Sequence, residues 1–264
     1  MSNMDRVVEI GRRVASETGL LRPARLLYRT IFDHDGRKRR QSLCHFYGQI
    51  IRRGDLVFDV GANVGVYSEV FASLGANVIA IEPLPDNVRR IRNARYRNKI
   101  KIVQTAVGAR VGTDKIRVAT SHTMASMSPE WVCASADSPR LRGAEWGWLG
   151  EMEVSITTLD SLCQTYGLPD FIKIDVEGYE ESVFDGLSIQ PKCLSFEFNP
   201  EILHATQRCL EKPVFNSSSE CNYIVGEPST FVLDRWTTKE LTMQHILDSR
   251  PSSWGDIFVR RPLS

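Results

Sequence analysis

The chain alternates short, mostly apolar runs with stretches whose apolar residues recur at helical spacing. The short runs are typical of central parallel strands, which are buried on both faces. They occupy residues 56–60, 78–81, 100–104, 171–175 and 194–198. The stretches between them place apolar residues three and four positions apart, as amphipathic helices do when they pack on a sheet. The pattern predicts an α/β fold with a mostly parallel sheet and helices on both faces.

The same spacing predicts the helices and the order of the domains. Helical segments are expected at residues 66–74, 85–96, 176–187 and 239–247. Two more helical stretches, residues 4–31 and 37–51, precede the first strand. We therefore expect an N-terminal helical segment over residues 1–53 and one α/β domain over residues 54–264, because no Pro/Gly/Ser-rich linker divides the rest of the chain.

The regular alternation breaks between residues 108 and 169. Two β segments, at residues 115–119 and 152–157, flank a polar stretch that contains Trp131, Trp146 and Trp148. A connection of this length between the third and fourth strands predicts a β insertion that serves either as a lid or as an added sheet edge. Either arrangement brings it close to a substrate.

Three strand-like runs remain after the fifth strand. They lie at residues 223–225, 231–233 and 256–260. We expect the last run to be an antiparallel closing strand.

A glycine turn joins the first strand to its helix and carries the first candidate site. Gly61 and Gly65 allow a tight turn and a close approach of a ligand. Glu82 ends the second strand 21 positions after Gly61, near the offset at which an acidic side chain accepts ribose hydroxyls. Asn63 replaces the middle glycine of a dinucleotide loop, and Asp59 would repel a phosphate. The loop therefore disfavours NAD and FAD and fits S-adenosylmethionine, which has a sulfonium, an ammonium and a ribose but no phosphate.

Five segments together resemble the FkbM-type S-adenosylmethionine-dependent methyltransferases, over roughly residues 54–200. They are Asp59-Val60-Gly61-Ala62-Asn63-Val64-Gly65, Ile81-Glu82-Pro83, Ala106-Val107-Gly108, Thr158-Leu159-Asp160 and, above all, the stretch from Phe171 to Glu180 that reads FIKIDVEGYE. The resemblance implies a Rossmann-like class I methyltransferase fold. It also implies O-methylation of a hydroxyl on a saccharide or a secondary metabolite, as is common in that family.

The resemblance further implies which residues bind the cofactor. The loop would hold the methionine end, Glu82 the ribose, and Ala106 with Val107 the adenine, while Asp175 would lie where the donor methyl meets the acceptor. The implied cofactor-binding residues are Asp59, Gly61, Ala62, Asn63, Val64, Gly65, Glu82, Pro83, Ala106, Val107 and Asp175.

An alcohol acceptor must lose a proton, and a positioned carboxylate or histidine can take it. The candidate catalytic residues are Asp175, Glu177, Glu197 and His204, with His122 behind them. Lys173 lies inside an apolar strand, so we expect it to form an ion pair with a neighbouring carboxylate.

Oxygen donors that could bind a hard cation gather at the same rim, namely Asp175, Glu177, Glu197 and Asn199. They show no dedicated ligand spacing, so we expect no metal. Six scattered cysteines without a CxxC pair indicate neither a zinc site nor a disulfide framework.

Charge is unevenly distributed, although the net charge is only +1. Residues 1–110 contain 20 Lys and Arg against 10 Asp and Glu, which leaves open an RNA or DNA methyltransferase. The strand end at Asp175-Val176-Glu177 lacks the [DNS]-P-P-[YFW] motif of base-methylating enzymes, so nucleic acid is the less favoured partner. A non-catalytic S-adenosylmethionine-binding domain is the third alternative.

The N-terminal sequence bears on the location of the protein in the cell. Residues 1–14 show neither a secretory signal nor a membrane span. We expect a cytoplasmic enzyme with a small-molecule or saccharide acceptor, and a homodimer as the candidate assembly.

Overall fold

The computed structural model describes residues 36–120, 125–141 and 147–262. The chain divides into two compact units, residues 1–43 and 44–264, and the sheet and the candidate site lie in the second. The helices expected over residues 4–31 fall outside the described residues, whereas a helix covers residues 36–47. The division into residues 1–53 and 54–264 stays a prediction.

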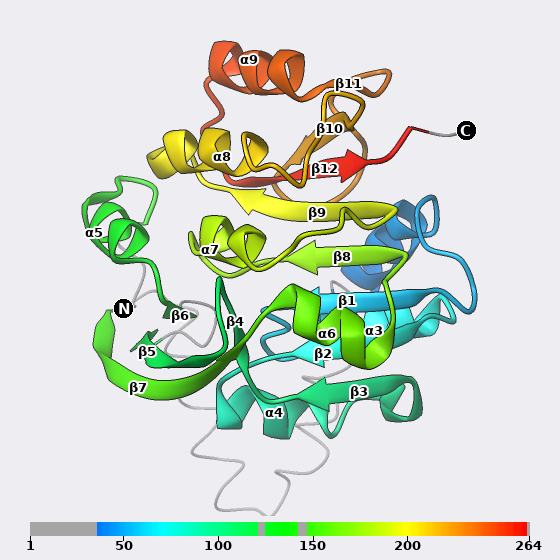
Figure 1. The fold of residues 1–264 in the computed structure, drawn as a ribbon, viewed down its shortest axis with the longest axis vertical. Helices are drawn as coiled ribbons and strands as arrows, with labels where there is room; N and C mark the ends of the chain where they lie inside the picture. Colours follow the sequence, from blue (N-terminus) through cyan, green and yellow to red (C-terminus); the bar gives the residue numbers. More distant parts are fainter. Residues whose placement is uncertain (1–35, 121–124, 142–146, 263–264) are drawn as a thin grey trace, which may run out of the picture. The chain divides into compact units, whose positions relative to one another are not determined.

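An eight-stranded sheet forms the centre of the second unit (Figure 1), in the order β11-β10-β12-β9-β8-β1-β2-β3. Strands β1 (Leu56–Val60), β2 (Asn77–Ile81), β3 (Ile100–Val103), β8 (Phe171–Ile174) and β9 (Cys193–Phe198) run parallel. Their carboxyl ends therefore meet at one edge, where ligands bind in open α/β sheets. The predicted mostly parallel α/β sheet is confirmed.

The last strand, β12 (Gly255–Arg260), is antiparallel as predicted but does not close the sheet. It lies between β9 and β10 (Glu220–Val225), with the short β11 (Thr237–Thr238) at the edge. The strand predicted at residues 231–233 is wrong. The backbone of Leu233 bonds the Asn222 side chain instead of a neighbouring strand. Asn222 Nδ2 donates to the Leu233 carbonyl at 2.8 Å, and the Leu233 N–H donates to Asn222 Oδ1 at 3.1 Å.

Helices cover both faces of the sheet. They are α3 (Val66–Ser73), α4 (Pro85–Ile91), α6 (Leu159–Tyr166), α7 (Glu180–Asp185), α8 (Leu203–Leu210) and α9 (Lys239–Ser249), with short 3-10 turns η1 (Arg97–Lys99) and η2 (Pro200–Ile202). The predicted helix over residues 85–96 ends early, at Ile91, because Ala94 N–H bonds the Ile91 carbonyl in a tighter turn. The segment predicted as a helix over residues 176–187 is helical only from Glu180 to Asp185.

Two apolar layers fix the sheet between its helices. On one face, Phe58, Ile174 and Phe196 pack with Val183 and Leu210 of the covering helices. On the other face lies an aromatic cluster made of Phe46, Tyr47, Tyr67, Phe71, Phe171, Phe231 and Phe258. The alternation of side chains along each strand sends Asp59 and Lys173 toward this second face.

The segment between β3 and β8 builds a second sheet with the order β4-β7-β5-β6. Its strands are β4 (Ala106–Val107), β5 (Gly112–Ala119), β6 (Ala125–Ser126) and β7 (Trp148–Thr157). The two β segments expected at residues 115–119 and 152–157 lie within β5 and β7. Helix α5 (Pro129–Asp137) follows β6 and packs through Trp131 on Ile202 and Ala205.

In the described part of the chain, every helix is too short or too polar to cross a membrane.

Candidate active site

The glycine loop after β1 lies directly against the carboxyl end of β8. Gly61 has φ 79° and Gly65 has φ 86°, both in the left-handed region that favours glycine. A Cβ at Gly61 would overlap the backbone oxygen of Asp175. The N–H groups of Gly61 and Ala62 both donate to the Ile81 carbonyl at 3.0 Å, which ties the loop to β2. The loop, the end of β2 and Asp175 thus form one surface.

Asp59 lies beneath this loop and is 1% exposed. Its Oδ2 accepts a hydrogen bond from Ser68 Oγ in α3 at 2.5 Å. Burial raises the pKa of Asp59 to about 6, although the Ser68 hydrogen bond and the Lys173 charge act in the opposite direction. The carboxyl group therefore anchors the helix behind the loop.

Glu82 ends β2 and is 4% exposed. Its Oε2 accepts from the N–H of Asn63 at 2.8 Å, and its Oε1 accepts from the N–H of Leu84 at 2.9 Å and from Asn87 Nδ2 at 3.3 Å. Burial raises the pKa of Glu82 to about 7 in spite of these donors. The side-chain oxygen Oδ1 of Asn63, which has φ 51°, is buried without a hydrogen-bond partner among the described residues. The loop therefore presents a free acceptor beside a carboxylate that is already oriented.

The other residues predicted to contact the cofactor are held near this edge by β4. Ala106 and Val107 are buried and pair in parallel with Ile156 and Thr157 of β7. Pro83 follows Glu82 and precedes the first turn of α4.

Three predicted catalytic carboxylates meet at the same edge. Asp175, Glu177 and Glu197 each place one oxygen within 4.8 Å of the others. Asp175 follows β8, Glu197 lies in β9, and Glu177 lies in the loop before α7, where its φ of 53° is unusual for a residue with a side chain. The fold therefore joins strand ends that are far apart in the sequence.

Lys173 holds one member of this trio. Its Nζ lies 2.8 Å from Asp175 Oδ2 and 4.4 Å from the centre of the Tyr67 ring, and its side chain is 2% exposed. Burial opposes its charge, but the carboxylates of Asp175 and Asp256 outweigh burial and hold the pKa of Lys173 well above its usual range. The predicted ion pair of Lys173 with a neighbouring carboxylate is confirmed.

Burial and mutual repulsion act on the other two carboxylates. Burial and then the charge of Asp175 raise the pKa of Glu177 well above its usual range. Burial and then the charge of Glu177 do the same for the pKa of Glu197. These side chains therefore take up a proton more readily than ordinary glutamates.

The insertion packs on the loop between β8 and α7, residues 175–179, which we call the acidic loop. Ser126 Oγ donates to the Glu177 carbonyl at 2.6 Å. A Cβ on Gly178 would lie 2.6 Å from the Cβ of Trp131, so helix α5 covers the turn closely. Arg140 pairs with Glu201 at 3.0 Å.

A side-chain relay extends this support to the third carboxylate of the trio. Arg140 Nη2 donates to Asn199 Oδ1 at 3.0 Å, and Asn199 Nδ2 donates to Glu197 Oε2 at 2.9 Å. The insertion thus reaches the carboxylates from two sides.

The model of the Methyltransferase FkbM domain matches residues 59–225, from the glycine loop to β10. The chain belongs to the FkbM methyltransferase family. It is therefore an S-adenosylmethionine-dependent methyltransferase with a Rossmann-like class I fold, and the resemblance seen in the sequence is confirmed.

Two curated relatives align with part of the chain. The 31-O-demethyl-FK506 methyltransferase FkbM of Streptomyces tacrolimicus is 28% identical, over 62% of this chain and 68% of that protein. The hexuronic acid methyltransferase AglP of Haloferax volcanii is 26% identical, over 54% of each chain. The alignment therefore spans about half the length of AglP.

Solved structures resemble the chain at lower identity. The O-methyltransferase from Bacillus cereus in complex with SAH aligns at 10% identity and a TM-score of 0.43, over 85% of this chain and 80% of its own. The ribosomal protein L11 methylase from Lactobacillus delbrueckii subsp. bulgaricus aligns at 12% identity and a TM-score of 0.42, over 84% and 78% of the two chains.

The loop of this FkbM-family chain fits S-adenosylmethionine in its own geometry. Gly61 and Gly65 let the turn pack closely on its neighbours, since a Cβ would overlap the Asp175 backbone at Gly61 and would lie 3.1 Å from the Ile91 side chain at Gly65. The orphaned Oδ1 of Asn63 is an acceptor for a donor such as an ammonium group, and the Glu82 carboxylate is an acceptor for hydroxyl groups. These groups offer no cation for a phosphate, so the chemistry agrees with a ligand that carries none.

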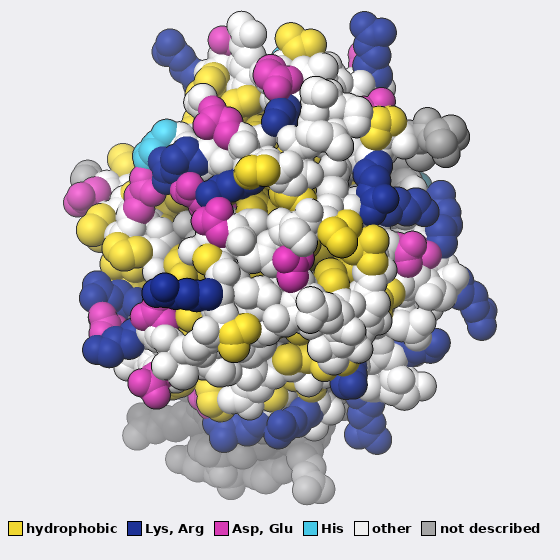
Figure 2. Space-filling view, in the orientation of Figure 1, with side chains coloured by type: hydrophobic (Ala, Val, Ile, Leu, Met, Phe, Trp, Pro, Cys, Tyr) yellow, Lys and Arg dark blue, Asp and Glu magenta, His cyan; other side chains and the backbone are white. Residues whose placement is uncertain are grey.

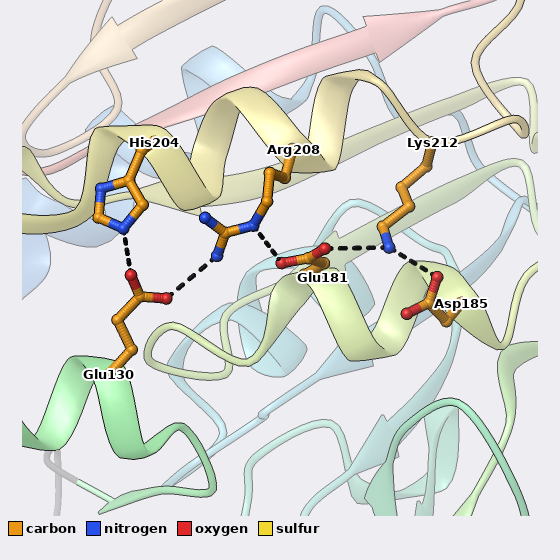
Figure 3. A network of polar contacts seen from close by, with 6 residues as sticks. All are labelled: Glu130, Glu181, Asp185, His204, Arg208 and Lys212. Carbon is orange, nitrogen blue, oxygen red and sulfur yellow. Dashed lines mark hydrogen bonds and ion pairs between the residues drawn. The ribbon is translucent and has the colours of Figure 1, made fainter.

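His204, the fourth predicted catalytic residue, belongs to a different group of side chains. It lies in α8 with 60% of its side chain exposed and pairs with Glu130 of α5. Figure 3 shows that this pair continues along the helices through Arg208, Glu181, Lys212 and Asp185. The carboxylate trio does not include His204. His122 and Trp146 lie outside the described residues.

Some residues at the site carried no sequence signal. Ser68 and Asn87 bond Asp59 and Glu82 from helices that begin after each strand, and polar residues are common in such positions. Glu180 lies in the first turn of α7, and its Oε1 accepts from the N–H groups of Val176 at 3.2 Å and Gly178 at 3.3 Å. It therefore caps the acidic loop.

Proposed function

We propose that this FkbM-family enzyme is an O-methyltransferase that methylates a hydroxyl group of a saccharide or a secondary metabolite. One observation carries the proposal: the carboxylate trio Asp175, Glu177 and Glu197 lies beside the glycine loop of residues 61–65, which we call the donor loop. Carboxylates can orient a hydroxyl and take its proton, whereas they offer little to an apolar carbon acceptor. The names of the two curated relatives, one acting at an oxygen of a natural product and one on a hexuronic acid, support the same acceptor class.

The donor loop would hold S-adenosylmethionine through named groups. Asn63 and the glycine turn would receive its methionine end, Glu82 its ribose, and Ala106 with Val107 its adenine. When bound, this cofactor supplies an electrophilic methyl group on a sulfonium. Because Gly61 touches Asp175, the same contact that shapes the loop also sets the position of the acceptor site.

The carboxylate trio would position the acceptor hydroxyl and take its proton. Lys173 fixes Asp175 in place, so that Asp175 can align the acceptor hydroxyl with the donor loop. Glu177 and Glu197 are the proposed proton acceptors, since a raised pKa makes an ionised carboxylate a stronger base. His204 has no part in this proposal because it lies in the surface network of α5 and α8.

Calorimetric titration with S-adenosylhomocysteine tests the donor site. The intact protein should bind it, and Glu82→Gln should weaken binding by roughly tenfold or more, because each lost hydrogen bond to a charged group costs about 1.5–3 kcal/mol. Glu153→Gln is the matched control, as Glu153 is exposed on β7. No heat with the intact protein would refute the proposal.

Methyl transfer to a panel of hydroxylated saccharides and natural products tests the acceptor site. Asp175→Asn and Glu197→Gln should lower turnover by roughly 10²- to 10⁴-fold, the usual contribution of a positioned base, and Glu197→Gln should leave S-adenosylhomocysteine binding intact. Binding without turnover on every acceptor would favour the non-catalytic alternative. A cytoplasmic location and a homodimer stay predictions.

A further inference from the structure

The carboxylate trio carries more negative charge than the described cations beside it neutralise. Of Asp175, Glu177 and Glu197, Asp175 is the one that pairs with Lys173 among the described residues. Arg140 is the next cation of the described chain, and its guanidinium is already bonded to Glu201 and Asn199. With all three acids ionised, the trio and Lys173 hold two net negative charges, which is the deficit that one divalent cation fills.

A second observation points to a ligand at the same place. Asp256 in β12 is 1% exposed, and its Oδ2 has no hydrogen-bond partner among the described residues. It lies directly opposite Glu197 in the antiparallel register of β9 and β12, so the two side chains leave the sheet on the same face. Asp256 interacts electrostatically with both Lys173 and Asp175, which places it beside the trio. A buried carboxylate with no donor is expensive, and a donor at the trio would satisfy it.

The spacing of the trio agrees with a cation shell. Hard divalent cations take oxygen ligands at about 2.0–2.6 Å, so ligand oxygens on one ion lie up to roughly 4–5 Å apart. The three carboxylates place oxygens within 4.8 Å of one another. Mg²⁺ usually keeps several of its waters, and such a water would supply the donor that Asp256 Oδ2 lacks.

We propose that Asp175, Glu177 and Glu197 bind a hard divalent cation of the Mg²⁺ class, and that Asp256 accepts a hydrogen bond from a water on that cation. The cation holds oxygen atoms of the acceptor beside the donor loop, and the second oxygen of Glu177, which the cation does not need, stays the proton acceptor. This role rests on the proposed O-methyltransferase function, whereas the binding itself does not. Lys173 occupies Oδ2 of Asp175 and leaves Oδ1 for the cation. The sequence favoured no metal, because its ligands come from two strands and a loop without a recognisable spacing.

Titration of the metal-free full chain with Mn²⁺, followed by electron paramagnetic resonance, tests the site. We expect one saturable site per chain, and Mg²⁺ should displace the Mn²⁺. Glu197→Gln and Glu177→Gln should each weaken Mn²⁺ binding by roughly tenfold or more, and Asp256→Asn by about 10-fold, as is typical of a partner outside the ligand set. Glu153→Gln should bind Mn²⁺ like the parent protein.

The variants remain interpretable because each replaces a buried or half-buried carboxylate by a neutral isostere and removes repulsion. Binding of S-adenosylhomocysteine, measured on the same samples without metal, shows that each variant is folded. If no saturable Mn²⁺ site exists, or if the Gln variants bind Mn²⁺ as tightly as the parent, the cation site is refuted, while intact S-adenosylhomocysteine binding leaves the proposed donor site standing. Loss of S-adenosylhomocysteine binding with Mn²⁺ binding retained would refute only the proposed function.

Discussion

Gly61 joins the two halves of the site at a single backbone position. It turns the loop after β1 with φ 79° and touches the backbone oxygen of Asp175. A residue with a side chain would meet both a conformational penalty of about 1–2 kcal/mol and a direct overlap. The shape of the donor loop and its contact with Asp175 therefore both require glycine at position 61.

Gly61→Ala should disrupt both functions of the site at once. The loop must shift away from Asp175, and a displacement near 1 Å can cost about 100-fold in a positioned reaction. We expect S-adenosylhomocysteine affinity to fall by at least about tenfold, measured by calorimetry. Gly150→Ala is the control, since its Cβ would meet nothing within 4 Å. Equal affinities of the two variants would contradict this account of Gly61.

The places of the donor-loop residues in the fold could be predicted because these residues follow one another or lie at a fixed offset, whereas their contacts with the cofactor stay predictions. Asp59, Gly61, Gly65 and Glu82 are all placed by one strand, one turn and the next strand. Asp256 could not be predicted, since it reaches the trio only through an antiparallel register with Glu197, about sixty residues earlier. Sequence patterns describe neighbours along the chain, and this contact runs across it.

At the scale of the elements, helix α5 packs directly on the acidic loop. Trp131 is 1% exposed and lies against Gly178, Ile202 and Ala205. The ion pairs between α5 and α8 lie on the surface, with the Arg208 side chain 42% exposed. Exposed pairs contribute about 0–1 kcal/mol, whereas burial of a tryptophan contributes several times more. Packing therefore holds α5, and the charges in Figure 3 mainly orient it.

Trp131→Ala should loosen α5 and with it the acidic loop. We expect a loss of about 3–5 kcal/mol in the free energy of unfolding, faster hydrogen exchange over residues 129–137, and a raised KM for the acceptor with little change in S-adenosylhomocysteine affinity. Arg208→Ala should cost less than about 1 kcal/mol. Leu149→Ala, at a side chain that is 69% exposed, serves as the control. If Arg208→Ala destabilised the protein more than Trp131→Ala, the ion pairs would be the main support.

The short helices show why some elements escaped prediction. Helices α5, α6 and α8 have nine, eight and eight residues, and helices this short gain most of their stability from packing. Their apolar residues are too few to set a clear period in the sequence. The five parallel strands and α3 were predictable, because mostly apolar runs mark the strands and Gly65 and Gly75 flank the helix.

At the scale of the whole molecule, the buried acids of the donor loop make stability depend on pH. Burial raises the pKa of Asp59 to about 6 and that of Glu82 to about 7. Unfolded, both groups titrate near pH 4, so between these values the folded chain holds protons that the unfolded chain has released. Stability is therefore fully present below about pH 4 and falls as pH rises through the folded pKa values, by at most about 3 kcal/mol for each carboxyl.

Acids that pair with cations outside the donor loop act with the opposite sign and in a different range. Ion pairs and hydrogen bonds with His204, Arg208 or Arg140 outweigh desolvation and lower the pKa of Glu130, Glu181 and Glu201. Their contribution is present above the ordinary glutamate pKa and is lost as pH falls through the lowered values. The two groups of acids together place the stability maximum of the ligand-free protein on the acidic side of neutrality.

Glu82→Gln should flatten the alkaline side of this profile and separate it from ligand binding. Urea unfolding at about pH 5 and about pH 8 should show a smaller difference in the variant than in the parent, because Gln carries no proton to release. Glu153→Gln should leave the difference unchanged. In the parent, S-adenosylhomocysteine affinity should rise toward pH 7, since Glu82 is the proposed acceptor for the ribose hydroxyls and only its ionised form accepts through both oxygens. That rise should disappear in Glu82→Gln, and a rise of equal size in both proteins would show that another group controls binding.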